Sequence, residues 1–306
     1  MKSLQSEILR TLLYYDIWHY PLTATELFTF LPVNSMTFDE FHRYLREEGT
    51  SENIRSDQGY YFVKGKGPGI VTQRREKERH ARRMWRMAML FTHIIKRFPF
   101  VRAICVSGDL SKNATDRKSD VDFFVITEPG RLWITRTLLI LFKKTVLLNS
   151  KKYFCLNFFA TSDHLELDEQ NVFLATEVAH LKPVFNSTLF HQYLSANQWI
   201  RRYFPNYDTR YLPFPRANER RSLVQRLFEF PFSFIPADRL DTYLMKKMDA
   251  MWARRYPEFD DATRSKIFRC TKHESRAYVG NFEEKILAIY EQRLREFGVA
   301  SHATIE

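Results

Sequence analysis

The chain has 306 residues, a length that predicts two or three domains, each able to bury a core. Its 44% hydrophobic and 27% charged residues describe a globular protein and exclude one dominated by disorder. The formal charge of +11 at pH 7 indicates an anionic partner. The most apolar stretch, residues 132–148, is interrupted by three basic residues, so we expect no membrane span and interpret the protein as cytoplasmic.

Residues 1–66 predict three short helices followed by a hairpin. An apolar helix comes first, and Thr23 and Thr37 then each open a capping-box pattern that a glutamate closes three residues later. Residues 53–66 predict two short strands around a turn at residues 57–59. Three helices and a hairpin resemble a winged helix.

The charge of this first region argues against the role in DNA binding that winged helices often have. Residues 1–66 carry seven Lys or Arg against nine Asp or Glu, and the third expected helix, residues 37–48, is itself acidic. An acidic helix suits a phosphate-lined groove poorly. We therefore expect a structural or protein-contact role for residues 1–66.

Residues 67–100 predict a long basic helix, because they hold nine basic residues against two acidic ones. One interpretation is a solvated helix whose opposite side faces the core. The core-facing side would then come from Met84, Met87, Met89, Phe91 and Ile95. The alternative is a positively charged wall that attracts phosphates.

Beyond residue 100 the pattern changes to strands alternating with a helix, which predicts a small α/β sheet. The expected strands are residues 100–108, 120–127 and 152–161, with a helix beginning near Arg131. We divide the chain into a winged-helix-like domain (1–66), an α/β core (67–165) and a helical C-terminal region (166–306).

Two aspartates, Asp120 and Asp122, stand at the head of the second of these strands. Residues two apart in a strand project to the same face, so both carboxylates lie together while Val121 and Phe123 face the core. Two adjacent like charges need a cation. Carboxylate oxygens suit Mg²⁺, which typically bridges one or two carboxylates to substrate phosphates.

The loop before the aspartates has the features of a phosphate-binding loop. Gly108, at the end of the first strand, permits close approach of backbone N–H groups to a phosphate. Ser107, Ser111 and Lys112 add side-chain donors, and Ser119 directly precedes the aspartate pair.

This glycine loop followed by Asp-x-Asp resembles the signature of the DNA polymerase β-like nucleotidyltransferase superfamily, with Gly108 as the motif glycine and Asp120 and Asp122 as the metal-binding pair. The resemblance covers residues 100–160. More loosely, the whole arrangement looks like bacterial nucleotidyltransferase-domain proteins. It implies an α/β nucleotidyltransferase core in which Mg²⁺ carries a nucleoside triphosphate. An acceptor hydroxyl would attack the α-phosphorus, and pyrophosphate would leave.

Three positions depart from the family's pattern. Asp109 takes the place of the motif serine, and Asn113 falls where a second glycine is common, although Asn also tolerates left-handed backbone geometry. Asn157 stands at the best candidate position for the third carboxylate of the family. Loss of a general base lowers the rate by about 10²–10⁴, unless Asp109 or Asp116 substitutes for it.

Further side chains are open to two interpretations. Arg131, at the start of the helix after the aspartates, either contacts phosphate or base or is an exposed helix residue. Glu177, Ser275 and Arg276 either close over a nucleotide or serve the structure. The cysteines (Cys105, Cys155 and Cys270) have no metal-type spacing, and no histidine pairs with a nucleophile motif.

The leading hypothesis is therefore magnesium-dependent transfer of a nucleotide to an unidentified hydroxyl on a protein, a nucleic acid or a small molecule. A protein that kept the fold and uses the nucleotide only as a regulatory ligand is the main alternative. A nucleic-acid-binding module is the third.

Overall fold

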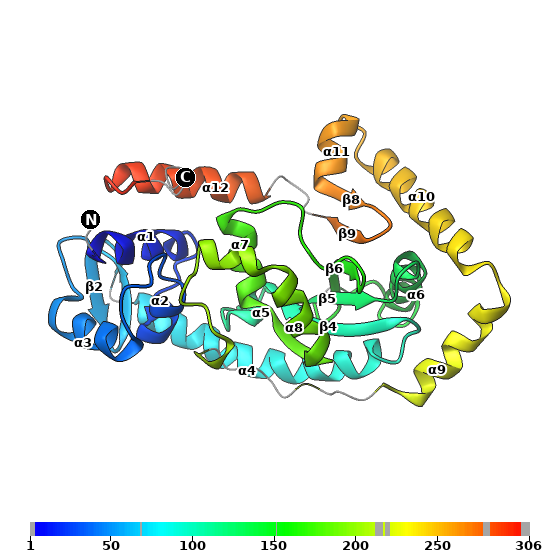
Figure 1. Ribbon diagram of the computed structural model, residues 1–306, viewed down its shortest axis with the longest axis horizontal. Helices are drawn as coiled ribbons and strands as arrows, with labels where there is room; N and C mark the ends of the chain where they lie inside the picture. The colour runs from blue at the N-terminus through cyan, green and yellow to red at the C-terminus, as the bar shows by residue number, and fades with distance from the viewer. Residues whose placement is uncertain are drawn as a thin grey trace.

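The structure is a computed structural model that describes residues 4–67, 69–150, 152–211, 217, 221–277 and 282–300. Within these ranges the protein is mixed α/β, with helices packed around a three-stranded and a six-stranded sheet (Figure 1). No helix within these residues is both long enough and apolar enough to cross a membrane.

The first region folds as the sequence predicts. It contains α1 (Leu4–Asp16), β1 (Leu22–Thr23), α2 (Ala24–Thr29), α3 (Phe38–Glu48), β2 (Ile54–Asp57) and β3 (Tyr60–Val63). Both capping boxes form: the Thr23 and Thr37 hydroxyls accept the backbone N–H three residues on, and the glutamate there accepts the threonine N–H. The hairpin turns through Gln58 and Gly59, whose φ angles of 49° and 83° suit a tight two-residue turn.

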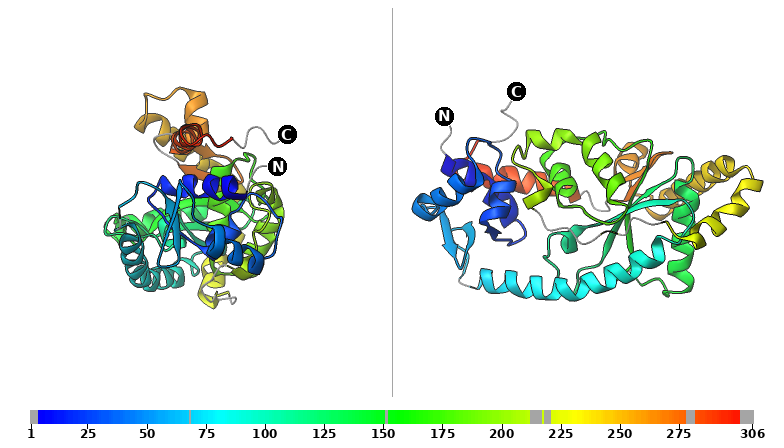
Figure 2. Two further views of the ribbon diagram at one scale, coloured as in Figure 1. Left: turned by 90° about the vertical axis from the view of Figure 1, so that its left-hand side faces the viewer. Right: turned by 60° about the horizontal axis from the view of Figure 1, so that its bottom comes forward.

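A single 26-residue helix, α4 (Ile70–Ile95), runs from this region along the α/β part of the molecule (Figure 2). Met84, Phe91 and Ile95 are buried as expected, whereas Met87 and Met89 are only half-buried. The helix also buries Arg74, which the sequence did not single out. Most other arginines of α4 face solvent, and none of its residues lines the central cavity described below.

The larger sheet has the strand order β7-β4-β5-β6-β9-β8, with only β5 and β6 parallel. Its strands are β4 (Val101–Ser107), β5 (Asp122–Thr127), β6 (Cys155–Thr161), β7 (Lys182–Phe185), β8 (Phe268–Cys270) and β9 (Glu274–Ala277). Three of the six come from beyond residue 166, so the prediction of a purely helical C-terminal region was wrong. These strands are only three or four residues long, too short for an alternating pattern to reveal.

Helices cover both faces of this sheet. Val121, Phe123 and Val125 are fully buried in a core shared with α4 and α6 (Leu132–Thr145), and Phe124 and Ile126 belong to a second core on the other face. The predicted inward direction of Val121 and Phe123 is thus confirmed. The strand begins at Asp122, so Asp120 lies just before it.

The remaining helices complete the second face and the far end of the molecule. They are α5 (Gly108–Ser111), α7 (Val172–His180), α8 (Ser187–Ala196), η1 (Gln198–Arg202), η2 (Thr209–Tyr211), α9 (Leu223–Glu229), η3 (Phe230–Phe234), α10 (Ala237–Arg255), α11 (Asp261–Ile267) and α12 (Phe282–Glu296). The last helix returns to the first, and the rings of Tyr14 and Tyr290 meet edge to face with centroids 5.1 Å apart (Figure 1). The first region therefore contacts α12 as well as the α/β part of the molecule.

Candidate active site

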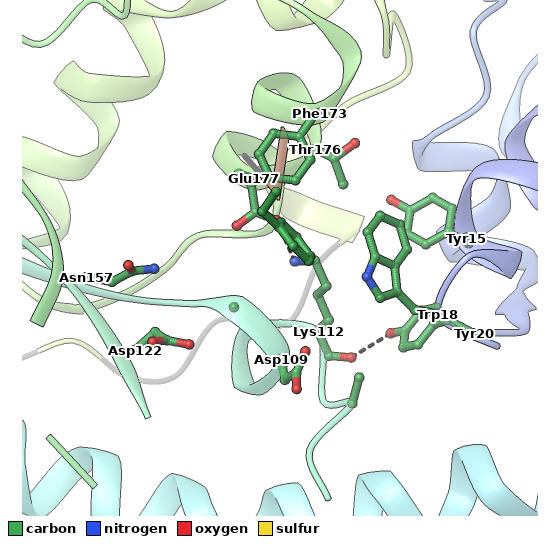
Figure 3. Close-up of a pocket in the computed structure, with 13 residues that line it drawn as sticks. Tyr15, Trp18, Tyr20, Asp109, Lys112, Asp122, Asn157, Phe173, Thr176 and Glu177 are labelled. Atoms are coloured by element: carbon green, nitrogen blue, oxygen red, sulfur yellow. Dashed lines mark hydrogen bonds and ion pairs between the residues drawn. The ribbon is translucent and has the colours of Figure 1, made fainter. Parts of the chain in front are cut away.

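A cavity of about 420 Å³ lies where the first region meets the sheet, and several of the residues that the sequence selected line it (Figure 3). One wall is formed by the strands β5 and β6 with α5, the other by the end of α1 and the turn that follows it. Gly108, Asp109, Lys112, Asp122 and Asn157 line the first wall. The cavity thus joins the predicted phosphate loop to one of the predicted metal ligands.

Gly108 is required at the junction of β4 and α5 for two reasons. Its φ of +64° lies in the left-handed region, which favours glycine. A Cβ atom at this position would also collide with the carboxylate of Asp122. The backbone of the loop and the aspartate are therefore in direct contact, as a phosphate–metal site needs.

The surroundings of Asp122 disfavour the ionised form of its carboxyl group. The pKa of its carboxyl group is raised from 3.8 to about 6, mainly by burial and also by the neighbouring charges of Asp120, Asp109 and Glu177, against a hydrogen bond from Cys155 that lowers it. Asp120 lies outside the lining of the cavity but acts on Asp122 through its charge. A bound cation would relieve this repulsion.

The other two loop acids have different surroundings. Asp109 lines the cavity and accepts a hydrogen bond of 2.7 Å from the Ser119 hydroxyl. Asp116 is exposed and accepts the backbone N–H groups of Lys118 and Ser119 at 2.7 and 3.0 Å, which lower its pKa. Asp116 therefore shapes the turn and Asp109 lines the cavity, while Ser119 bonds to both and does not itself line the cavity.

Asn157 occupies an irregular position on β6. The pairing with β5 steps from Phe123–Leu156 to Phe124–Phe158, so Asn157 is the extra residue of a bulge. Bulges re-aim side chains, and this one directs the Asn157 amide to the cavity on the same side as Asp122 (Figure 3). The position expected for a third carboxylate is thus at the site but holds an amide.

A carboxylate that the sequence left open stands at this cavity instead. Glu177, on α7, lines the cavity and forms an ion pair of 2.7 Å with Lys112. The Lys112 carbonyl oxygen in turn accepts the hydroxyl of Tyr20 at 2.5 Å. Glu177 and Lys112 therefore connect the phosphate loop to both α7 and the first region.

The opposite wall is aromatic and was missed by the sequence analysis. Tyr15, Trp18 and Tyr20 line the cavity, although residues 1–66 were expected to have only a structural or protein-contact role. The sequence carries no signal for this, because it does not show how the first region docks onto the sheet. Phe173 of α7 and Phe282 of α12 extend the aromatic lining.

The remaining predicted residues divide into three cases. Ser107 is 7% exposed, and its hydroxyl has no hydrogen-bond partner in the described part of the chain. Ser111 is buried and donates 2.8 Å to the Gly108 carbonyl oxygen, which closes the α5 turn. Arg131 lies at the other end of β5, ion-paired with Asp238, so its assignment to nucleotide binding was wrong: the strand carries it away from the loop.

Arg276 is held by acids rather than aimed at the cavity. It lies on β9 opposite Phe158, is 5% exposed, and contacts Glu169 at 2.5 Å and Glu274 at 3.3 Å. It does not line the 420 Å³ cavity but borders a hollow of about 40 Å³ that adjoins that cavity at Asn157. The segment of Ser275 and Arg276 is therefore part of the sheet and not a closing flap.

The residues present suit a magnesium ion that is bound together with a ligand. No group of three or more His, Cys, Asp or Glu side chains in the described ranges forms a complete metal cage. Mg²⁺ often takes only one or two carboxylates, with waters and substrate phosphates as its other ligands. Asp122, which the charge of Asp120 repels, and the Gly108 turn fit that form of site. The Ser107 hydroxyl, unpaired within the described residues, borders the small hollow that adjoins the cavity at Asn157.

Comparisons of the chain with protein families, with curated proteins and with solved structures give no match. The function must therefore be argued from the geometry of the cavity.

Proposed function

We propose that this protein is a magnesium-dependent nucleotidyltransferase of the DNA polymerase β-like type, with a winged-helix-like N-terminal domain. One observation carries the proposal: Asp122 abuts the Gly108 turn at the cavity, with its pKa raised to about 6 by burial and by three neighbouring carboxylates. A carboxylate in such a cleft beside a glycine turn is the arrangement that binds a metal with a phosphate.

In this proposal the residues of the strand wall position the triphosphate. Magnesium held by Asp120 and Asp122 would supply the positive charge that offsets the phosphates and Asp109. The backbone of the Gly108 turn and the Ser107 hydroxyl donate hydrogen bonds to phosphate oxygens. Lys112 keeps Glu177 at the cavity and adds one positive charge there.

Glu177 takes the role that Asn157 cannot perform. An amide oxygen can contact a metal weakly but cannot accept a proton. Glu177 lines the same cavity, so it can remove the proton of the acceptor hydroxyl as that oxygen attacks the α-phosphorus. Asp109, the acid favoured by sequence alone, is engaged by Ser119.

The alternative of a catalytically silent nucleotide-binding regulator has its own support. Lys112 already engages the Glu177 carboxylate in an ion pair of 2.7 Å, and Asn157 supplies no acid. Nucleotide would then bind without being turned over.

The test is incubation with labelled nucleoside triphosphates, Mg²⁺ and cell extract, following pyrophosphate release and transfer of the label. We expect both for the wild type. The double variant Asp120→Asn, Asp122→Asn should lose Mg²⁺-dependent nucleotide binding in titration calorimetry. The matched control, Glu47→Gln with Glu52→Gln, removes two exposed carboxylates of the first region and should bind normally. Unchanged Mg²⁺-dependent affinity in the aspartate variant would refute the site.

A further inference from the structure

The segment of residues 223–234, formed by α9 and η3, presents its large apolar side chains to solvent. Leu223, Leu227, Phe230 and Phe234 follow one another at helical spacing and are 79%, 70%, 61% and 72% exposed. Buried helices show the reverse pattern. We name these four residues the outer stripe.

Polar side chains hold the inner side of the same segment on the body. Gln225 is fully buried and donates to the carbonyl oxygens of Val101 and Phe98 at 2.6 and 3.1 Å. Glu229 accepts the backbone N–H of Phe100 at 2.7 Å. These hydrogen bonds fix the orientation of the segment on the body of the protein. The outer stripe therefore faces solvent in a defined orientation.

The surroundings of the outer stripe are positively charged. Residues 221–239, which hold the outer stripe and the start of α10, carry three arginines (Arg221, Arg226 and Arg239) against two acids. Both acids form ion pairs with arginines: Glu229 with Arg102 and Arg221, and Asp238 with Arg131. The exposed Arg226 lies within the segment itself. An apolar face bordered by cations is complementary to an anionic lipid surface.

The place and shape of the segment also favour a flat, fluid partner. Figure 1 shows α9 at the extremity of the molecule opposite to the first region. An apolar hollow of about 490 Å³ lies beneath it, between Phe98, Leu138 and Phe228, with Arg97 at its edge. The segment therefore projects as a ridge, with room under it for apolar groups.

We propose that the outer stripe inserts into the headgroup–acyl boundary of an anionic lipid bilayer and binds the protein peripherally to that surface. A segment of this length, on the order of 18 Å as a helix, is too short to cross but long enough to lie in the interface.

Pairing with a second copy through a coiled coil is disfavoured by the same residues. The stripe spans fewer than the three heptads that such pairing needs, and Pro231 interrupts it. Val224 and Phe228, which are 41% and 55% exposed, also make the apolar face wider than the seam of a coiled coil, which uses two positions in each heptad. The proposal does not depend on nucleotidyl transfer.

The experiment sediments the full-length protein with vesicles of phosphatidylcholine alone or mixed with phosphatidylserine. We expect binding to the mixed vesicles and much weaker binding to the neutral ones. The variant Leu227→Glu with Phe230→Glu should bind more than tenfold more weakly, and Arg226→Ala about fivefold more weakly. The matched control is Leu148→Glu, which changes a side chain that is 87% exposed in the loop after α6 and should leave binding unchanged.

Three results would overturn the proposal. The stripe variant could bind as the wild type does, or the wild type could bind neutral and mixed vesicles equally. The wild type could also stay in solution with every vesicle. In that case sedimentation equilibrium decides the role of the face: a dimer that the stripe variant dissociates would make the outer stripe an interface between copies of this chain.

Discussion

The two walls of the cavity differ in whether their charged side chains have partners of opposite charge. On the strand wall, Asp122 is crowded by other carboxylates, and its pKa is raised to about 6. On the aromatic wall the charge of Arg74 is balanced: its guanidinium lies 3.6 Å from the centre of the Tyr20 ring and contacts Glu26 and Glu78 at 2.8 and 2.7 Å. The carboxylates at Asp122 repel one another, whereas the charges around Tyr20 attract one another.

This difference indicates that the two walls have different roles. An unbalanced carboxylate cluster costs stability and persists where a ligand offsets it. A satisfied polar network under an aromatic surface instead gives rigidity, as the Tyr15 hydroxyl shows by its 2.9 Å contact with the buried His180 ring. We infer that the strand wall performs the chemistry and the aromatic wall recognises the base or the acceptor.

The largest expected effect concerns the proposed base, Glu177 of α7. If Glu177 accepts the acceptor's proton, Glu177→Gln should lower the rate of pyrophosphate release by about 10²–10⁴ with little change in nucleotide affinity. Asn157→Asp should then bring only a small gain, whereas it should raise the rate by a similar factor if no other base acts.

The same assay tests Asp109 as the base. Asp109→Ser restores the family's motif residue and should leave turnover unchanged or improved if Glu177 is the base. A fall in turnover would assign the role to Asp109. Flat traces for all variants, despite demonstrated nucleotide binding, would establish the silent regulator.

Substitutions in the aromatic wall should change the binding affinity for nucleotide or acceptor rather than the rate of transfer. Stacking of a base on an aromatic side chain contributes about 1–3 kcal/mol, so Trp18→Ala should weaken nucleotide or acceptor binding by roughly 5- to 150-fold. Trp18→Phe is the matched control because it keeps a stacking face. Unchanged affinities for every nucleotide and acceptor with Trp18→Ala would confine this wall to a structural role.

The sequence predicted the strand wall because its signals are local. Gly108, Asp120 and Asp122 lie within one short stretch, and the alternation with Val121 and Phe123 correctly placed Asp122 opposite the core, although Asp120 lies outside the cavity lining. The capping boxes at Thr23 and Thr37 are local in the same sense. Such features are decided by a few neighbouring residues.

What the sequence could not predict depends on contacts between distant segments. Trp18 and Tyr20 reach the site only because the first region docks onto α5, and Glu177 reaches it from α7. Arg131 was placed wrongly because it is near the aspartates in sequence but one strand length away in space. The β9 strand was missed because its neighbour in the sheet, β6, precedes it by more than a hundred residues.

A smaller effect distinguishes Asp122 of the strand wall from Asp116 of the preceding turn by the pH dependence of stability. The pKa of Asp122 is raised from 3.8 to about 6, so protonation favours the folded state. Stability therefore falls as the pH rises from about 4 to about 6 and stays at that lower level above it. Asp122→Asn should remove this dependence and stabilise the metal-free protein by about 1–3 kcal/mol at pH 7, measured by urea unfolding.

Asp116→Asn is the control, and its expected effect on stability has the opposite sign. The pKa of Asp116 is lowered by backbone N–H groups, so its ionised form stabilises the fold, and that contribution is lost as the pH falls through its folded-state pKa. The variant should be less stable than wild type at pH 7, with a difference that shrinks on acidification. Parallel pH profiles for both variants would contradict the assignment of a strained Asp122.

The smallest expected effect concerns nucleic acid. Neither wall of the cavity contains a residue of α4, and the solvent-facing arginines of that helix are the main basic surface next to the first region. We expect the full chain to bind duplex DNA weakly, without sequence preference and with strong salt dependence. Replacing Arg82, Arg83 and Arg86 by Ala should reduce the slope of log affinity against log salt by up to about three, since each lost phosphate contact removes roughly 0.9. Arg43→Ala, on the acidic α3, serves as the control and should change nothing in a fluorescence anisotropy titration. A tight, sequence-selective complex that depends on Arg43 would instead make the first region a DNA reader, and the aromatic wall of the cavity would then belong to a nucleic-acid-binding protein.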